Sequence, residues 1–194
     1  MYRSLLAALA LFSVSSSAWA GGLGLLTTAG LHQTRAYYYD DAGNQGIDGQ
    51  TRANYGGGII AMLGDKDDKV QGVMRLWYLQ DQAQAVPDTG STEDAIYPDE
   101  ASKGATHLGM FTAGVQWGLL GDPSKFLFTL ETHAGSGFAT EDAREFLLVE
   151  VGPGATYALS DSLLLFGSIT ADMRYRKRVT FSENVTLGAR VMFD

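Results

Sequence analysis

The chain contains no cysteine, only 4 prolines and, after its first residues, no long apolar run. Without cysteine it can form no disulfide and offers no thiol for lipid attachment. A membrane-spanning helix needs about 20 consecutive apolar residues, and no such segment follows residue 20. These absences exclude a disulfide-stapled domain, an acylated lipoprotein and a helical membrane protein.

Basic residues are also scarce, with 14 Lys and Arg against 22 Asp and Glu and a formal net charge of −8. A surface that binds nucleic acid must be basic because it meets phosphates. The composition therefore argues against a nucleic-acid partner. No repeat, linker or Pro-rich tract divides the chain, so we expect one domain after the N-terminal segment.

The N-terminal segment has the three regions of a secretory signal peptide. Residues 1–4 carry one positive charge at Arg3, residues 5–14 are apolar, and Ala18-Trp19-Ala20 is an A-x-A cleavage site. A retained membrane anchor is the alternative, but the apolar run is too short to span a bilayer. The sequence thus predicts a cleaved signal peptide over 1–20, export from the cytoplasm, and a mature domain over 21–194.

Eight stretches in which apolar and polar residues alternate follow the signal peptide. They cover residues 23–38, 50–63, 70–80, 106–119, 125–135, 145–159, 162–175 and 182–193. Short connections (64–69, 120–124, 160–161) alternate with longer ones (39–49, 81–105, 136–144) and a modest last one (176–181). An even number of strands with short turns at one end and long loops at the other is typical of bacterial outer-membrane barrels. We therefore predict an all-β fold, an eight-stranded antiparallel up-and-down transmembrane β-barrel.

The last two stretches separate most clearly into two faces. In 182–193 the apolar face carries Val185, Leu187, Ala189, Val191 and Phe193.

A soluble β-sandwich or a lipocalin-like barrel also has strands of alternating apolar and polar residues, with the apolar face inward. Here the polar face carries few charges, of both signs, among Gly, Ser and Thr, whereas a solvated face usually carries more Lys and Glu. Aromatic residues near the expected strand ends favour the membrane: Tyr55, Trp117, Phe126, Tyr157, Tyr175 and Phe193.

Two stretches are less clear. In 23–38 the pairs Leu25-Leu26 and Thr27-Thr28 fit either register. In 50–63 the run Gly56-Gly57-Gly58 predicts a bulge or a tight backbone bend.

The whole mature pattern resembles the eight-stranded outer-membrane proteins of the OmpA and OmpX type. Residues 185–193 also resemble the closing strand of those proteins, which ends on an aromatic residue and is read by the barrel-assembly machinery. The departure is Asp194, which follows Phe193. The resemblance implies the bacterial outer membrane as location and the assembly machinery as a partner during insertion, and it leaves the function open.

Charged residues of both signs fall on the face that the alternation directs inward. Eight strands leave an interior just wide enough for side chains to fill, and buried charges must be paired. The sequence therefore predicts a lumen network of Arg52, Arg75, Glu131, His133, Glu150, Asp172, Arg174 and Arg190. The favoured interpretation is a salt-bridged plug; the alternative is a small solute pore whose ion pairs exchange partners.

An enzyme is the second function class. Glu131, His133 and Ser136 resemble the catalytic residue types of the outer-membrane lipid A deacylases, and this resemblance implies a lipid A-modifying hydrolase. However, the alternation directs His133 into the lumen, and a Gly-rich strand-to-loop transition explains Ser136 more simply. We therefore predict no catalytic residues. We also predict no cofactor and no metal, because Ala42 occupies a required ligand position in the segment that resembles a calcium loop.

The expected extracellular loops carry the remaining signals. Arg176, Lys177 and Arg178 follow Tyr175 at the upper membrane edge and form a candidate site for lipopolysaccharide phosphates, which Arg binds bidentately. An exposed basic loop is the alternative. The acidic segment 81–105 is interpreted as a solvated flap, or as a binder of divalent cations or a basic partner. The sequence thus favours a non-enzymatic outer-membrane barrel that stabilises the envelope or binds lipopolysaccharide, a surface ligand or another envelope subunit.

Overall fold

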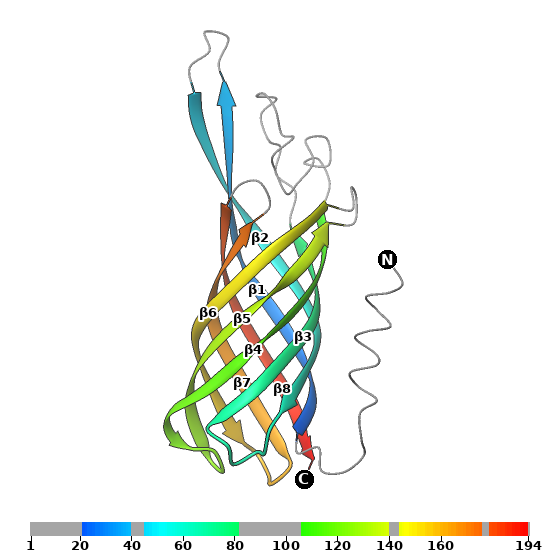
Figure 1. The fold of residues 1–194 in the computed structure, drawn as a ribbon, viewed down its shortest axis with the longest axis vertical. Helices are drawn as coiled ribbons and strands as arrows, with labels where there is room; N and C mark the ends of the chain where they lie inside the picture. The colour runs from blue at the N-terminus through cyan, green and yellow to red at the C-terminus, as the bar shows by residue number, and fades with distance from the viewer. Residues whose placement is uncertain (1–20, 40–44, 82–105, 140–143, 176–178, 194) are drawn as a thin grey trace.

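The computed structural model describes residues 21–39, 45–81, 106–139, 144–175 and 179–193. They form eight strands: β1 (Gly21–Tyr39), β2 (Gln45–Leu63), β3 (Val70–Asp81), β4 (Thr106–Asp122), β5 (Phe126–Ala139), β6 (Arg144–Ala158), β7 (Leu163–Tyr175) and β8 (Val179–Phe193). Each strand pairs antiparallel with the next, and β8 pairs with β1, so the sheet closes into a barrel (Figure 1). This confirms the all-β, eight-stranded antiparallel barrel. No helix in the described part of the chain is long and apolar enough to cross a membrane.

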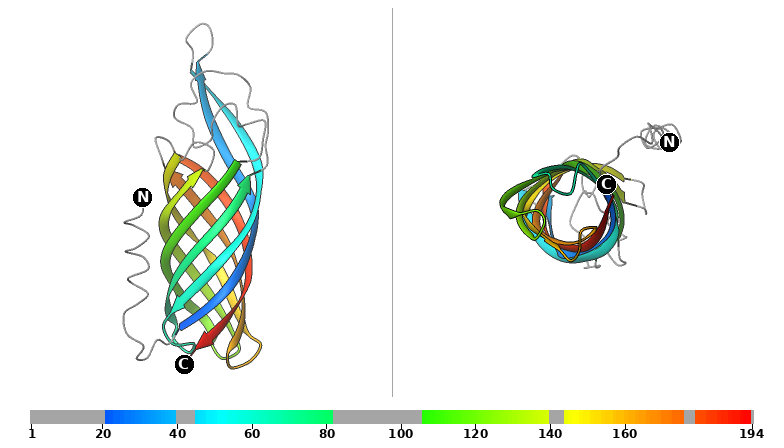
Figure 2. Two further views of the ribbon diagram at one scale, coloured as in Figure 1. Left: turned by 90° about the vertical axis from the view of Figure 1, so that its right-hand side faces the viewer. Right: turned by 90° about the horizontal axis from the view of Figure 1, so that it is seen from below.

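The strands are tilted and staggered around the barrel axis (Figure 2). We start at Gly21 of β1 and step to the paired residue on each following strand in turn. After all eight strands the path returns to β1 at Leu31, so the stagger around the barrel is ten residues. Such a stagger requires strands inclined by about 35–45° to the axis. Because of this tilt, a long side chain can reach strands on the opposite wall.

Exposure alternates along each strand, as the sequence pattern predicts. In β7 every second side chain is buried, and the intervening Leu165, Ile169 and Met173 are 40%, 62% and 42% exposed. Large apolar side chains therefore cover the outside of the barrel on all strands. A soluble protein rarely exposes so continuous an apolar surface, whereas a barrel in lipid requires it.

The structure decides the two unclear stretches. In β1 Leu26 points inward with 5% exposure, and Leu25 points outward with 70% exposure. In β2 the register runs unshifted through residues 56–58 against both neighbouring strands, so no bulge occurs there. The register shift lies instead in β4, between Gly118 and Leu120.

The interior is less polar than the alternation suggests. Eleven buried apolar side chains form a cluster inside the barrel: Leu26, Ile60, Met62, Val73, Trp77, Leu79, Leu108, Met110, Phe146, Leu148 and Phe166. Two aromatic rings fit because a glycine lies next to each on a neighbouring strand. A Cβ on Gly188 would come within 2.3 Å of the Phe166 ring, and one on Gly137 within 2.4 Å of the Phe146 ring. Close packing of this kind leaves little free space along the axis.

The connections at one end of the barrel are short, at 64–69, 123–125 and 159–162; we call this the turn end and the opposite end the loop end. In the turn after β4, Asp122 accepts hydrogen bonds from Ser124 N–H (2.9 Å) and Oγ–H (2.7 Å). The bond from the Ser124 hydroxyl, and to a lesser extent the bond from its N–H, hold the pKa of Asp122 below its ordinary value of 3.8. The contact fixes the turn as an Asx-type turn.

At the loop end, β1 and β2 extend beyond the rest of the barrel as a two-stranded ribbon (Figure 1). Their mutual pairing continues to Tyr39 and Gln45. In contrast, β1 pairs with β8 only as far as Gln33, and β2 pairs with β3 only from Asn54. The connection between β1 and β2 is therefore shorter than the loop over 39–49 that the sequence predicts, because β2 begins at Gln45.

Candidate functional site

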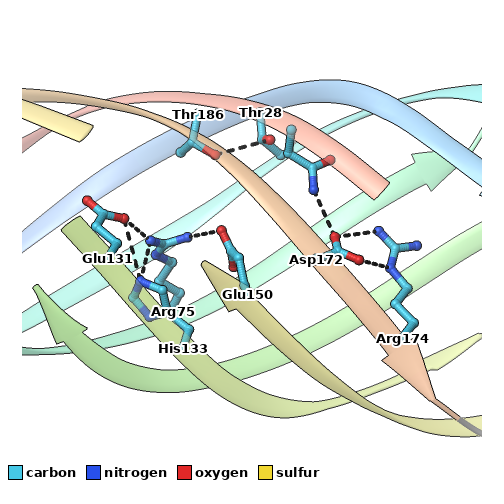
Figure 3. A network of polar contacts seen from close by, with 9 residues as sticks. Thr28, Arg75, Glu131, His133, Glu150, Asp172, Arg174 and Thr186 are labelled. Carbon is cyan, nitrogen blue, oxygen red and sulfur yellow. Dashed lines mark hydrogen bonds and ion pairs between the residues drawn. The ribbon is translucent and has the colours of Figure 1, made fainter. Parts of the chain in front are cut away.

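A charged network crosses the middle of the lumen, the space inside the barrel (Figure 3). Arg75 of β3 is 2% exposed and donates to Glu150 Oε1 of β6 at 3.0 Å and to Glu131 of β5. It also lies 2.6 Å from His133 Nε2 of β5. One cation thus joins side chains of three strands, with both carboxylates buried.

A second polar group lies towards the loop end on β7 and β8. Arg174 donates to the two carboxylate oxygens of Asp172 at 3.0 and 3.2 Å, and Asn184 Nδ2 donates to the same carboxylate at 2.8 Å. The Arg174 guanidinium also lies 6.0 Å from the centre of the Phe146 ring. This carboxylate is therefore fully engaged within the lumen.

Arg190 of β8 crosses the lumen near the turn end. It donates to Gln116 Oε1 of β4 at 3.3 Å and to Gln71 Oε1 of β3 at 3.4 Å. Its guanidinium lies 5.8 Å from the centre of the Phe166 ring. Gln71 is held in turn by a bond from its Nε2 to the Asp65 carbonyl in the β2–β3 turn, at 2.6 Å. Arg190 thus connects β8 to the opposite wall through neutral amides.

The residues expected to form one lumen network fall into two groups in the structure. One group is Arg75, Glu131, His133 and Glu150, and the other is Asp172 and Arg174. Arg190 forms its hydrogen bonds outside both groups, but it interacts electrostatically with Glu131. Arg52 of β2 pairs with His32 of β1, and the side chain of Arg52 is not described. Arg176, Lys177 and Arg178 lie outside the described residues.

Sequence reasoning missed the neutral partners of this network. Gln71, Gln116 and Asn184 all fall on the inward face, which was the available signal, but they carry no charge to draw attention. His107 lies in β4 and hydrogen-bonds Tyr78 on the outer face, and the centres of the two stacked rings are 5.7 Å apart. His32 of β1 is buried and contacts Ser182 of β8.

The hydrolase arrangement is not assembled in the described residues. His133 is 2% exposed inside the lumen, whereas Ser136 is exposed on the outer face of the same strand. A base on one face of a sheet cannot activate a nucleophile on the other. Ser136 instead belongs to a groove of about 370 Å³ near the loop end, lined by Ser136, Gly137, Phe138, Glu145, Phe146, Leu147 and Tyr175.

The fold matches known eight-stranded barrels. The solved structure of Neisserial surface protein A (NspA) superposes with a TM-score of 0.55 at 12% identity, covering 89% of this chain and 97% of NspA. Ail, the attachment invasion locus protein of Yersinia pestis, gives 0.48 at 13% identity over 91% of this chain and 100% of Ail. The N-terminal barrel domain of Pseudomonas aeruginosa OprF gives 0.39 at 12% identity over 86% and 96%. No protein-family model and no curated protein sequence matches the chain.

The fold and its apolar exterior define the class of protein: an eight-stranded outer-membrane β-barrel of the OmpA/OmpX architecture. At these identities the likeness extends to the fold and no further. The resemblance expected from the alternating strands is confirmed at that level.

Proposed function

We propose that this protein is a non-enzymatic outer-membrane barrel with a plugged lumen, exported by its signal peptide, that stabilises the envelope by holding lipopolysaccharide at its rim. The observation that carries the plug is the Arg75 network, which joins β3, β5 and β6 across the interior. In this proposal the turn end faces the periplasm and the loop end faces outward, as in other barrels of this kind.

The plug is supported by the burial of the groups that form it. Glu150 is 0%, Arg75 2% and Glu131 4% exposed. An eight-stranded barrel is just wide enough to be filled by side chains, and here Arg190 crosses the same lumen nearer the turn end. A conducting path would have to displace both arginines from their partners.

Lipopolysaccharide binding is supported by the outer rim. The groove near the loop end has apolar walls from Phe138, Leu147 and Tyr175, which suit acyl chains. The chain continues from Tyr175 directly into Arg176-Lys177-Arg178, whose side chains suit the phosphates of a lipid headgroup. Apolar groove residues and cationic residues are therefore adjacent in the chain.

The test changes Arg176, Lys177 and Arg178 together to Ser and measures the lipopolysaccharide that co-purifies with the barrel in mild detergent. We expect less bound lipid, because the phosphate partners are removed. The matched control changes Lys66, Lys69 and Lys125, in turns at the opposite end, to Ser and should retain the wild-type amount. Equal retention in both triple variants would refute lipid binding at the loop end.

The plug has its own test in planar bilayers. We expect no steady conductance from the wild-type barrel. If the wild type conducts, and Glu131→Gln or Arg75→Ala changes the current, the protein is a small solute pore instead.

A surface ligand or another envelope subunit is the second candidate partner, favoured by the β1–β2 ribbon. In the described residues, both edges of this ribbon are unpaired beyond Gln33 and before Asn54. Unpaired strand edges can accept a strand from a partner. Cold electrophoresis of a mild-detergent extract decides this point: a large unboiled species that collapses on heating indicates a complex, and a single fast-migrating unboiled band indicates a barrel that acts alone.

A further inference from the structure

The groove near the loop end owes its shape to two small residues, Ser136 and Gly109. On the outer face, Ser136 of β5 pairs with Phe111 of β4 on one side and with Leu147 of β6 on the other, both of which are large. One outward position closer to the loop end, the ring of Phe138 lies over Gly109 of β4, where a Cβ would come within 2.7 Å of the ring. The ring therefore covers β4, and the space over Ser136 and the end of β6 stays open as the groove of about 370 Å³.

The groove is charged at one end and apolar at the other. Leu147 of β6 and Tyr175 of β7 pair with each other and are 61% and 52% exposed. Glu145 lies two residues closer to the loop end on β6, where it pairs with Phe138 and is exposed. Side chains two residues apart on a strand point to the same face, so the carboxylate follows the apolar wall on the outer side of the sheet. The groove thus suits an amphiphile whose apolar part points towards the turn end and whose head lies at Glu145.

The charge of the groove selects the kind of head. Glu145 is the charged residue among those that line the groove, and no described Lys, Arg or His lies within 4.0 Å of its carboxylate. A phosphate placed beside this carboxylate would be repelled as a like charge, whereas an ammonium group would be attracted and can donate three hydrogen bonds. Ser136 and Tyr175 supply hydroxyl groups to the same groove. The described residues therefore favour a cationic head over a bare phosphate.

We propose that the groove binds a lipopolysaccharide whose lipid headgroup carries a primary amine next to its phosphate, with the ammonium group paired to Glu145 and an acyl chain along Leu147 and Tyr175. This inference rests on the proposed function, because it takes the groove to be a lipid site, and it adds the headgroup that the site selects. The amine neutralises Glu145, which would otherwise be a like charge beside the lipid phosphates.

The test adds equal amounts of lipid A and of lipid A with a phosphoethanolamine-substituted phosphate to the purified barrel in detergent that contains a metal chelator. Native mass spectrometry then compares the two bound masses in the same spectrum. We expect the wild type to prefer the amine-bearing lipid by about two- to fivefold, the effect of one exposed ion pair. Glu145→Gln should make binding of the two lipids equal, because it removes the charge and keeps the shape of the side chain.

Two further variants separate the carboxylate from the groove. Glu183→Gln is the matched control, because Glu183 is also an exposed carboxylate on the outer face, on β8, but does not line the groove. It should keep the wild-type ratio of the two lipids. Ser136→Leu fills the groove and should reduce the binding of both lipids alike. All three positions are exposed, and cold electrophoresis of unboiled samples checks that each variant is folded.

Equal binding of the two lipids by the wild type, or a preference that Glu145→Gln retains, would overturn the selection of an amine and leave the groove as a lipid site. A preference for unmodified lipid A once magnesium replaces the chelator would indicate a metal bridge from Glu145 to a phosphate, and it would also overturn the proposal. If Ser136→Leu binds both lipids as the wild type does, the groove holds no lipid, and the proposed function fails at this groove together with the inference.

Discussion

Replacing Arg75 by Met removes a cation that joins β3 to β5 and β6. Met has a similar length and fits among the apolar side chains of the lumen. The change leaves Glu131 and Glu150 as buried carboxylates without the cation that hydrogen-bonds them, and Glu150 Oε2 already lacks a hydrogen bond. The structure thus predicts that the loss of folding stability comes from buried carboxylates that have lost their counter-charge, and not from lost packing.

The magnitude follows from the burial of the pair. Removing one partner of a buried ion pair typically costs about 3–5 kcal/mol. Small proteins lose about 1–3 kcal/mol of stability per molar urea, so a loss of about 4 kcal/mol lowers the urea midpoint by roughly 2 M. The triple variant Arg75→Met, Glu131→Gln, Glu150→Gln should recover most of this loss, because neutral groups of similar volume carry no comparable penalty.

The assay is cold electrophoresis of the barrel in detergent after equilibration in urea, in which the folded form migrates faster than the unfolded form. Lys69→Met, an exposed position in the β2–β3 turn, is the control and should change stability by less than about 0.5 kcal/mol. If Arg75→Met has a midpoint within about 0.3 M of the wild type, roughly 0.6 kcal/mol at a typical slope, the network does not hold the lumen together.

Two further changes test the sheet and its turns. Gly152→Ala should destabilise the barrel by about 1–3 kcal/mol or more, because its Cβ would lie 2.0 Å from the Ile169 carbonyl oxygen; Gly72→Ala, where the nearest atom is 3.3 Å away, should be tolerated in the same urea assay. Asp122→Ala should destabilise the turn near neutral pH because it removes the hydrogen bonds from Ser124. The native state holds the pKa of Asp122 below 3.8, so its contribution is present above that value and is lost as the pH falls through the lowered pKa. The stability difference between Asp122→Ala and the wild type should therefore vanish in acid, and a difference independent of pH would contradict this.

The sequence alone determined which residues face the lipid in most strands. Side chains in a strand alternate with a period of two, and lipid tolerates apolar groups only. Val185, Leu187 and Val191 are accordingly exposed on the outside, and Asn184, Thr186 and Arg190 are buried inside. The alternation of short and long connections likewise predicted the strand order of the barrel.

The tertiary structure alone decided the positions at which the local pattern is degenerate. Leu25 and Leu26 are the same residue type, so only the ladder to β2 and β8 determines that Leu26 enters the lumen. Strand ends show the same limit, because β1 and β2 continue as a ribbon past the point at which their apolar pattern stops.

The tertiary structure also decided which charges meet. The alternation directs Arg75, Glu131 and Arg190 to the same interior, but it does not specify their partners. Arg75 reaches β5 and β6, and Arg190 reaches β3 and β4, because the stagger and tilt of the closed barrel bring opposite walls within the length of an arginine. Partners across the lumen are therefore a property of barrel closure: they depend on the relative height of strands distant in sequence, which no single strand encodes.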